Sequence, residues 1–342
     1  MQNKIASFQI LRGVAIALIF LSHCEHLLKI NDINVLMYWG AAGVSLFIAL
    51  AGFLVARKCL SSNVSVNAIA LYKSRWKQFY KYHFLTMIIA MPFTCGLLIS
   101  NPIKWVAKML PNLTLIHAFI PSKVIYFSFN AVSWYLSLML AFALFTPAAI
   151  FVWKKCTLKI TIGVIFFIVV FEAGSAALLG SQEIFHWIAY IFPGTRFLDF
   201  FAGGGAYMIA KYIKEKGLYK LNWFLFVASC VSFVGLLLLS CFYGNNFFLT
   251  AIWTIPSTLI VLSLSNIIVE QSLPITKILV GFGNISFEFF LVHHLTIKYF
   301  SILFKSLDAP YTGAYILSFI IVCVVAFMLH NWPLNSRKQA ES

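Results

Sequence analysis

The chain has 342 residues, of which 61% are hydrophobic and only 10% are charged, and its formal net charge is +15. A soluble domain carries about 25% charged residues, so this composition excludes a water-soluble fold and predicts a polytopic membrane protein. The basic excess is typical of cytoplasmic membrane loops, and because the sequence contains no nucleic-acid motif we expect no nucleic-acid partner. The seven scattered cysteines lack metal-ligand spacing and predict neither disulfides nor a metal site.

Apolar stretches of about 20 residues recur from end to end, each long enough to cross a bilayer as a helix. The segment at 105–120 is shorter and contains Pro111, so we expect it to be re-entrant or interfacial. The predicted fold is all-α, a single transmembrane domain over 1–342 without an appended soluble domain. Its ten expected spans lie at about 8–28, 38–56, 82–100, 131–152, 159–179, 190–210, 221–242, 247–269, 282–304 and 312–330.

The distribution of basic residues among the loops predicts the orientation. With ten spans and the N-terminus inside, most Lys and Arg side chains of the loops fall on the cytoplasmic side. Counting 105–120 as an eleventh span would place the later basic loops outside. We therefore expect both termini in the cytoplasm.

The first span contains two ionisable residues, Arg12 and His23, eleven positions apart. Eleven residues of helix return to within about 20° of the same face and rise about 16 Å. An imidazole can take the proton of a hydroxyl that attacks an acyl group, and a guanidinium suits a phosphate or a developing oxyanion. The alternative is structural: Arg12 would reach the headgroups and His23 would bond a backbone carbonyl.

Two further blocks follow along the chain. The small residues of 43–58 favour close helix packing. The run YKSRWKQFYKYH at 72–83 interleaves basic and aromatic residues, as expected of a cytoplasmic membrane boundary. The alternative for Arg75, Lys77 and Lys81 is that they receive an anionic cosubstrate.

The middle of the chain offers weaker signals. Trp134 can donate a hydrogen bond within a span, and an interfacial anchor is the alternative. Arg196 and Asp199 are three positions apart, which predicts a local ion pair. The sequence gives no assignment for Glu172, a lone acid within a span.

A late cluster places Glu288, His293 and His294 within seven positions of one span. Three ionisable groups facing lipid would be costly, so we expect this face to look into the protein or into a water-filled cavity. An interhelical hydrogen-bond network is the alternative.

Taken in order, five motifs resemble the blocks of the acyltransferase 3 family of integral-membrane O-acyltransferases, over residue 5 to about 330. Three departures stand out: Ala51 replaces a serine, Phe287 and Phe290 replace two tyrosines, and the block after Arg75 lacks the family's second arginine and proline. The motifs are LRGVAIALIFLSH, GVSLFIALAGFLV, SWYLSLML, RFLDFFAGGGAY and GNISFEFFLVHH.

This resemblance implies an enzyme of the bacterial cytoplasmic (inner) membrane that moves an acyl group, usually acetyl, from cytoplasmic acyl-CoA. The acceptor would be a hydroxyl of a cell-surface polysaccharide or lipid-linked sugar, with membrane lipid as surroundings and no metal. The leading alternative is a multi-span transporter of a lipid-linked sugar or an anion. The implied roles are catalysis by His23 with Arg12 at the donor, receipt of the CoA nucleotide by Arg75, Lys77 and Lys81, and pocket lining or orientation of His23 by Trp134, Glu288 and His293.

Overall fold

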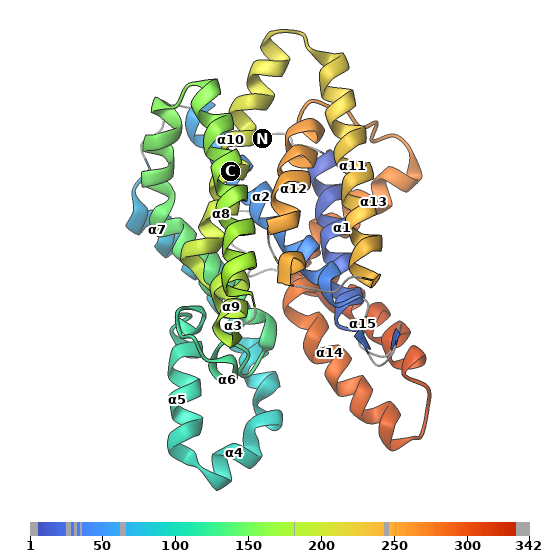
Figure 1. The fold of residues 1–342 in the computed structure, drawn as a ribbon. Coiled ribbons are helices and arrows are strands. Elements are labelled where there is room, and N and C mark those ends of the chain that lie inside the picture. Colours follow the sequence, from blue (N-terminus) through green and yellow to red (C-terminus); the bar gives the residue numbers. More distant parts are fainter. Residues whose placement is uncertain are drawn as a thin grey trace.

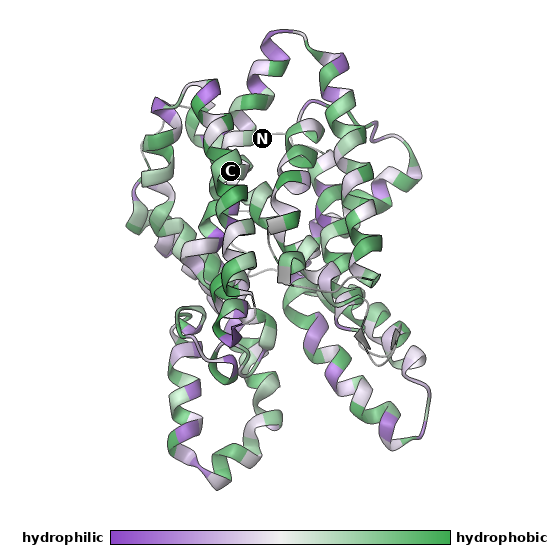
Figure 2. Ribbon diagram, in the orientation of Figure 1, coloured by the Kyte–Doolittle hydropathy of each residue, from purple (hydrophilic) through white to green (hydrophobic). Residues whose placement is uncertain are grey.

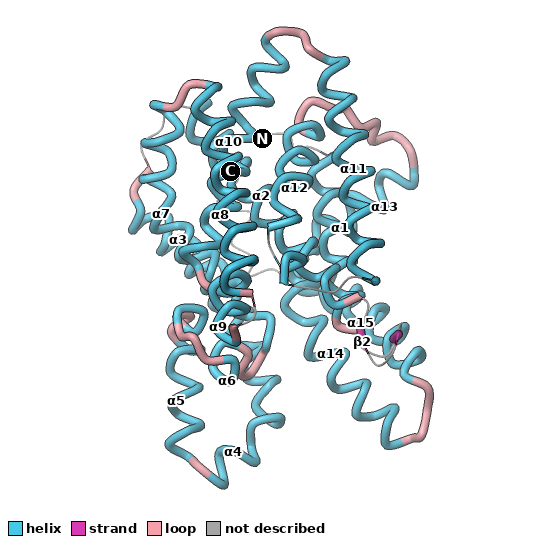
Figure 3. The backbone as a smooth tube through the Cα atoms, in the orientation of Figure 1, coloured by secondary structure: helices cyan, strands magenta, loops and turns pink. Residues whose placement is uncertain are grey.

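The computed structural model is helical almost throughout and confirms the all-α prediction (Figures 1 and 3). It describes residues 6–24, 29–30, 33–34, 36–61, 66–180, 182–242, 246–249 and 251–332. Within this part, the strands are the two-residue β1 (Lys29–Ile30) and β2 (Ile33–Asn34), which pair antiparallel with Lys29 opposite Asn34.

A helix lies at each of the ten predicted positions, and eight described helical stretches are long and apolar enough to cross a membrane. The two others are α1 (Ala6–Ser22), which has 17 residues, and α10 (Pro193–Glu215), which carries buried charges. The eight stretches are Met37–Ser61 (α2), Ala68–Ser100 (α3, Ala68–Ala90, to α4, Cys95–Ser100), Ala131–Lys155 (α7, Trp134–Lys155), Leu158–Leu179 (α8), Tyr219–Phe242 (α11), Phe247–Leu264 (α12, Ala251–Leu264), Ser286–Ser306 (α14) and Tyr311–Asn331 (α15).

The segment predicted not to span begins in α5 (Pro102–Leu113), a helix of 12 residues. With α4 it forms a hairpin that projects from one end of the bundle (Figure 1). The remaining short helices are α6 (Lys123–Tyr126), α9 (Glu183–His186) and α13 (Pro274–Asn284), together with the π-helical turn η4 (Trp187–Ile191). The 105–120 segment therefore contributes no full span.

The two ends of the bundle differ in charge. The α7–α8 and α10–α11 loops lie together at the top of Figure 1, and Figure 2 shows hydrophilic residues gathered there. Lys154, Lys155 and Lys214 are near these loops. The α4–α5 hairpin and the α14–α15 loop lie at the opposite end. We call the first the basic end, which the charge distribution predicts to be cytoplasmic.

Close packing of α2 against α10 organises the centre. A Cβ added to Gly52 would collide with the backbone of Phe200, and one added to Gly203 would collide with the carbonyl of Ala49. Glycine at both positions lets the two backbones approach closely enough for direct contact. The structure thus confirms the packing role predicted for this part of the 43–58 block.

We expect Gly203→Ala to destabilise the protein by about 1–3 kcal/mol, because its methyl group overpacks the α2–α10 contact. Thermal unfolding in detergent measures the effect. The matched control is Gly235→Ala in α11, where an added Cβ meets no atom within 4 Å. The control should gain up to about 1 kcal/mol from helix propensity. Equal stability of the two variants would contradict the packing account.

Candidate active site

A basic pocket of about 950 Å³ lies between α1, α2, α3, α7 and α14, near the basic end. Its described lining contains no Asp or Glu side chain. A pocket of this size, with several cations and no acid in its described lining, suits an anionic ligand of cofactor size. The cations of its lining are Arg12, Arg57, Lys58, Arg75 and Lys77.

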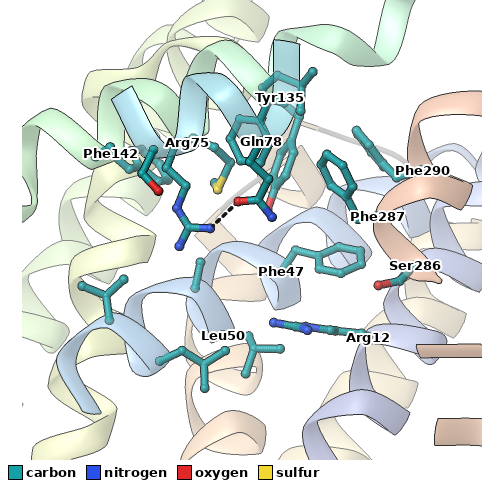
Figure 4. Close-up of a pocket in the computed structure, with 18 of the residues that line it drawn as sticks. Arg12, Phe47, Leu50, Arg75, Gln78, Tyr135, Phe142, Ser286, Phe287 and Phe290 are labelled. Atoms are coloured by element: carbon teal, nitrogen blue, oxygen red, sulfur yellow. Dashed lines mark hydrogen bonds between the residues drawn. The ribbon is translucent and has the colours of Figure 1, made fainter. Parts of the chain in front are cut away.

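Arg12 and Arg75 reach this pocket from different helices, and both guanidinium groups point into it (Figure 4). Arg75 in α3 donates to the Gln78 side chain at 3.0 Å, which fixes its direction. Arg12 in the second turn of α1 donates to Gln9 at 3.3 Å. Guanidinium groups held in this way offer the paired N–H donors that phosphates and carboxylates accept.

The inner wall of the pocket is aromatic. Phe287 and Phe290 of α14 face Tyr135 of α7, whose ring centroid lies 5.2 Å from that of Phe290 (Figure 4). Ala51 of α2 also lines the pocket. At positions 51, 287 and 290 the resembled motifs carry a serine and two tyrosines, whereas this chain carries Ala51, Phe287 and Phe290. The wall is therefore more apolar than those motifs imply and suits a short aliphatic group.

Three histidines gather at the far end of α1. The ring centroid of His23 lies 5.2 Å from that of His293 and 4.9 Å from that of His294. His293 Nδ1 lies 2.7 Å from the Phe290 carbonyl, which can only accept, so Nδ1 carries the hydrogen. In the neutral ring Nε2 is then an acceptor, and this atom is buried without a hydrogen-bond partner in the described chain. It is available to orient His23.

Helices α1 and α14 keep the two ionisable sites in register. Arg12 and Ser286 both line the basic pocket, whereas His23 lies beside His293, seven residues further along α14. Seven residues correspond to about 10.5 Å of helix. Arg12 thus reaches the basic pocket and His23 reaches the histidine cluster, and α14 contributes residues to both.

The first helix ends just before His23. The predicted span at about 8–28 corresponds to α1, which ends at Ser22, and 25–28 lie outside the described residues. The backbone N–H of His23 bonds the Phe20 carbonyl at 3.1 Å, a bond over three residues that tightens and closes the last turn. His23 therefore sits on a turn just beyond the helix.

One aromatic ring separates the basic pocket from the histidine cluster. Phe290 lines the pocket, and its ring centroid is 5.8 Å from that of His293. A ligand bound by the cations and extending along the aromatic wall would end beside these imidazoles. The pocket and the cluster are therefore adjacent parts of one candidate site.

The structure places three of the predicted site residues elsewhere. The fully buried carboxylate of Glu288 lies 3.5 Å from His330 Nδ1, at the end of α15. Lys81 Nζ sits over the ring of Tyr82, 4.7 Å from its centroid, outside the described pocket lining. Trp134 is 4% exposed, packs against Tyr190, and is also absent from that lining.

Sequence reasoning missed His330, which lines the basic pocket beside Glu288. No motif marked it, because its partner lies about 40 residues earlier on another helix. Arg57 and Lys58, near the C-terminal end of α2, also belong to the lining.

A second histidine pair has a packing role. His83 Nε2 donates to the Asn112 carbonyl at 2.8 Å, and Ser133 Oγ lies 3.2 Å from His117 Nε2. All four residues are fully buried. Burial lowers the pKa of His117 to about 3, so its ring is neutral near pH 7. This network ties α3 and α5 to the start of α7.

Comparisons with known proteins identify similarity to acyltransferases. A family model described as "Acyltransferase domain" matches residues 5–330. The acyltransferase MdmB of Streptomyces mycarofaciens is 27% identical over 282 residues, which cover 76% of this chain and 69% of that protein. No solved structure matches the chain significantly.

The cation-rich pocket predicts stabilisation by a small polyanion. Inorganic pyrophosphate should bind in this pocket and raise the melting temperature of the detergent-solubilised protein. At 100 times its dissociation constant, the expected gain in the free energy of unfolding is about 2.7 kcal/mol. Arg75→Gln should lose most of this effect because it removes a charge that points into the pocket. Lys277→Gln, which removes an exposed cation outside the described lining, is the control and should keep it. An identical response of both variants would exclude this pocket as the anion site.

Proposed function

The chain belongs to the acyltransferase family whose model spans residues 5–330, and from this premise we propose that it is a membrane O-acyltransferase using acyl-CoA. The acyl group in this proposal is acetyl, and the acceptor is a hydroxyl of a cell-surface polysaccharide or lipid-linked sugar. The basic end faces the cytoplasm of a bacterium, and the multi-pass bundle lies in its inner membrane.

One observation carries the donor assignment: the described pocket lining holds five cations and no acid, and its aromatic wall lies next to the histidine cluster. The phosphates of CoA bind among Arg12, Arg75 and Lys77, and the pantetheine arm follows the wall inward. Arg12 and His23 are about 16 Å apart along the helix direction, a distance that a flexible arm can bridge. A transporter would need the same cations, but it would not need three imidazoles grouped next to the aromatic wall of the pocket.

His23 acts as the general base. It takes the proton of the acceptor hydroxyl while the oxygen attacks the thioester carbonyl. The C–O bond forms, the C–S bond breaks, and the CoA thiolate leaves and takes up a proton. His293 is a positioning residue, because its Nε2 can accept an N–H from His23 and leave the other His23 nitrogen free for the hydroxyl.

Replacing the base should abolish turnover. We expect His23→Asn to lower kcat for acceptor-dependent release of free CoA by about 10²- to 10⁴-fold, with little change in the KM for acyl-CoA. Thiol detection in membranes that receive acetyl-CoA and acceptor measures this. His186→Asn is the control, since His186 bonds Tyr126 away from the cluster. Wild-type rates in His23→Asn would refute the assignment.

His330 should serve the nucleotide end of the donor. Glu288 holds its imidazole at the pocket, so His330→Gln and Glu288→Gln should raise the KM for acetyl-CoA by about 10- to 100-fold, the value of one hydrogen bond to a charged group. The kcat should change little. Acetyl-pantetheine, which lacks the nucleotide, is the control substrate and should be handled equally by all three proteins. A parallel loss with both substrates would indicate structural damage instead.

A further inference from the structure

A second ionisable cluster lies outside the basic pocket, where α8, α10 and α12 meet. Arg196 and Asp199 of α10 form the predicted ion pair at 2.6 Å. Thr254 of α12 places its hydroxyl 2.7 Å from Asp199 Oδ1 and 2.7 Å from Glu172 Oε2, which belongs to α8. All four side chains are at least 93% buried. The acid that the sequence left without an assignment is thus part of a connected network.

The number of hydrogens available in this network determines whether both acids can be ionised. A threonine hydroxyl carries one hydrogen, so it can donate to one of the two carboxyl oxygens at 2.7 Å but not to both. The other short contact requires that a carboxyl group donate to the hydroxyl oxygen. One of the two acids must therefore be protonated.

The charge count identifies which one. The surrounding described groups are neutral: Ser45 of α2 accepts from Arg196 Nη2 at 3.2 Å, and the ring of Tyr190 lies 5.8 Å from Arg196. One guanidinium therefore faces two carboxyl groups, and its direct partner is Asp199. An additional unpaired carboxylate among apolar helices would cost several kcal/mol. Protonation of Glu172 removes this cost and makes the cluster neutral.

Glu172 is also reached from outside. It lines a second pocket, of about 390 Å³, between α8 and the segment from η4 to the start of α10. Phe171 and Leu178 in its wall are 48% and 81% exposed, on a bundle surface that would face hydrocarbon chains. A small apolar molecule dissolved in the bilayer can therefore enter and meet the carboxyl group.

We propose that Glu172 is a proton-binding site within the bundle, occupied at neutral pH and accessible from the lipid phase. The bound proton completes a hydrogen-bonded bridge from α8 through Thr254 to the Arg196–Asp199 pair. The proposal is independent of the acyl-transfer function, because none of these residues lines the basic pocket.

An apolar carbodiimide tests both protonation and access. The carboxyl proton moves to a carbodiimide nitrogen, and the carboxyl oxygen bonds to the central carbon to give an O-acylisourea. Migration of the acyl group to nitrogen yields a stable N-acylurea without a leaving group. Dicyclohexylcarbodiimide at neutral pH should leave this adduct on the Glu172 peptide in mass spectrometry, and Glu172→Gln should carry none. Absence of the adduct in the wild-type protein would overturn the proposal.

Two further measurements distinguish a protonated Glu172 from an ordinary carboxylate that the reagent merely reaches. Asp199→Asn leaves Glu172 as the single acid beside Arg196, so it should ionise and its labelling should fall at least tenfold. Undiminished labelling in a variant that elutes as a monodisperse species would overturn the proposal. If that variant fails to fold, the wild-type pH profile decides: labelling should persist at neutral pH and fall only in alkaline solution. Loss of labelling already below neutral pH would show an ordinary carboxylate.

Discussion

The free-energy cost of burying ionisable side chains among apolar helices is the main constraint on this structure. Arg196, Asp199, Glu172 and Glu288 are all at least 93% buried among helices that the lipid surrounds. Each is stable there because another helix supplies a partner: α12 for Glu172 and α15 for Glu288. These pairings fix the relative positions of the helices more specifically than apolar contact does, since an apolar face accepts many neighbours and an ionisable group accepts few.

Close backbone packing supplies the second constraint. Gly52 and Gly203 let α2 and α10 touch, which brings Ser45 to the buried Arg196 and sets the wall of the basic pocket that includes Leu50 and Ala51. The same helix, α2, thus contributes to the neutral buried cluster on one side and to the cation-rich pocket on the other. Small residues that serve only packing still determine where the chemistry takes place.

The basic pocket and the histidine cluster are two parts of the site with different charge. Cations collect where water and an anionic ligand can enter, and imidazoles collect behind an aromatic wall. This separation keeps the positive charge away from His23, which accepts a proton in the proposed reaction. In the proposed reaction, binding energy is gained at the basic end and the bond change takes place about 16 Å further along α1.

The sequence by itself determined the helical class and the positions of the helices, and it placed Arg12 and His23 about three turns apart along the first span, because these features depend on hydropathy and on the period of a single helix. It also identified His293 through its neighbours in the chain. It could not determine that Glu288 pairs with His330, that Glu172 and Asp199 both contact the Thr254 hydroxyl, or that Lys81 and Trp134 lie outside the described lining. Those outcomes depend on which helices contact each other in the tertiary structure. The sequence does not reveal them, because partners on different helices leave no periodic signal.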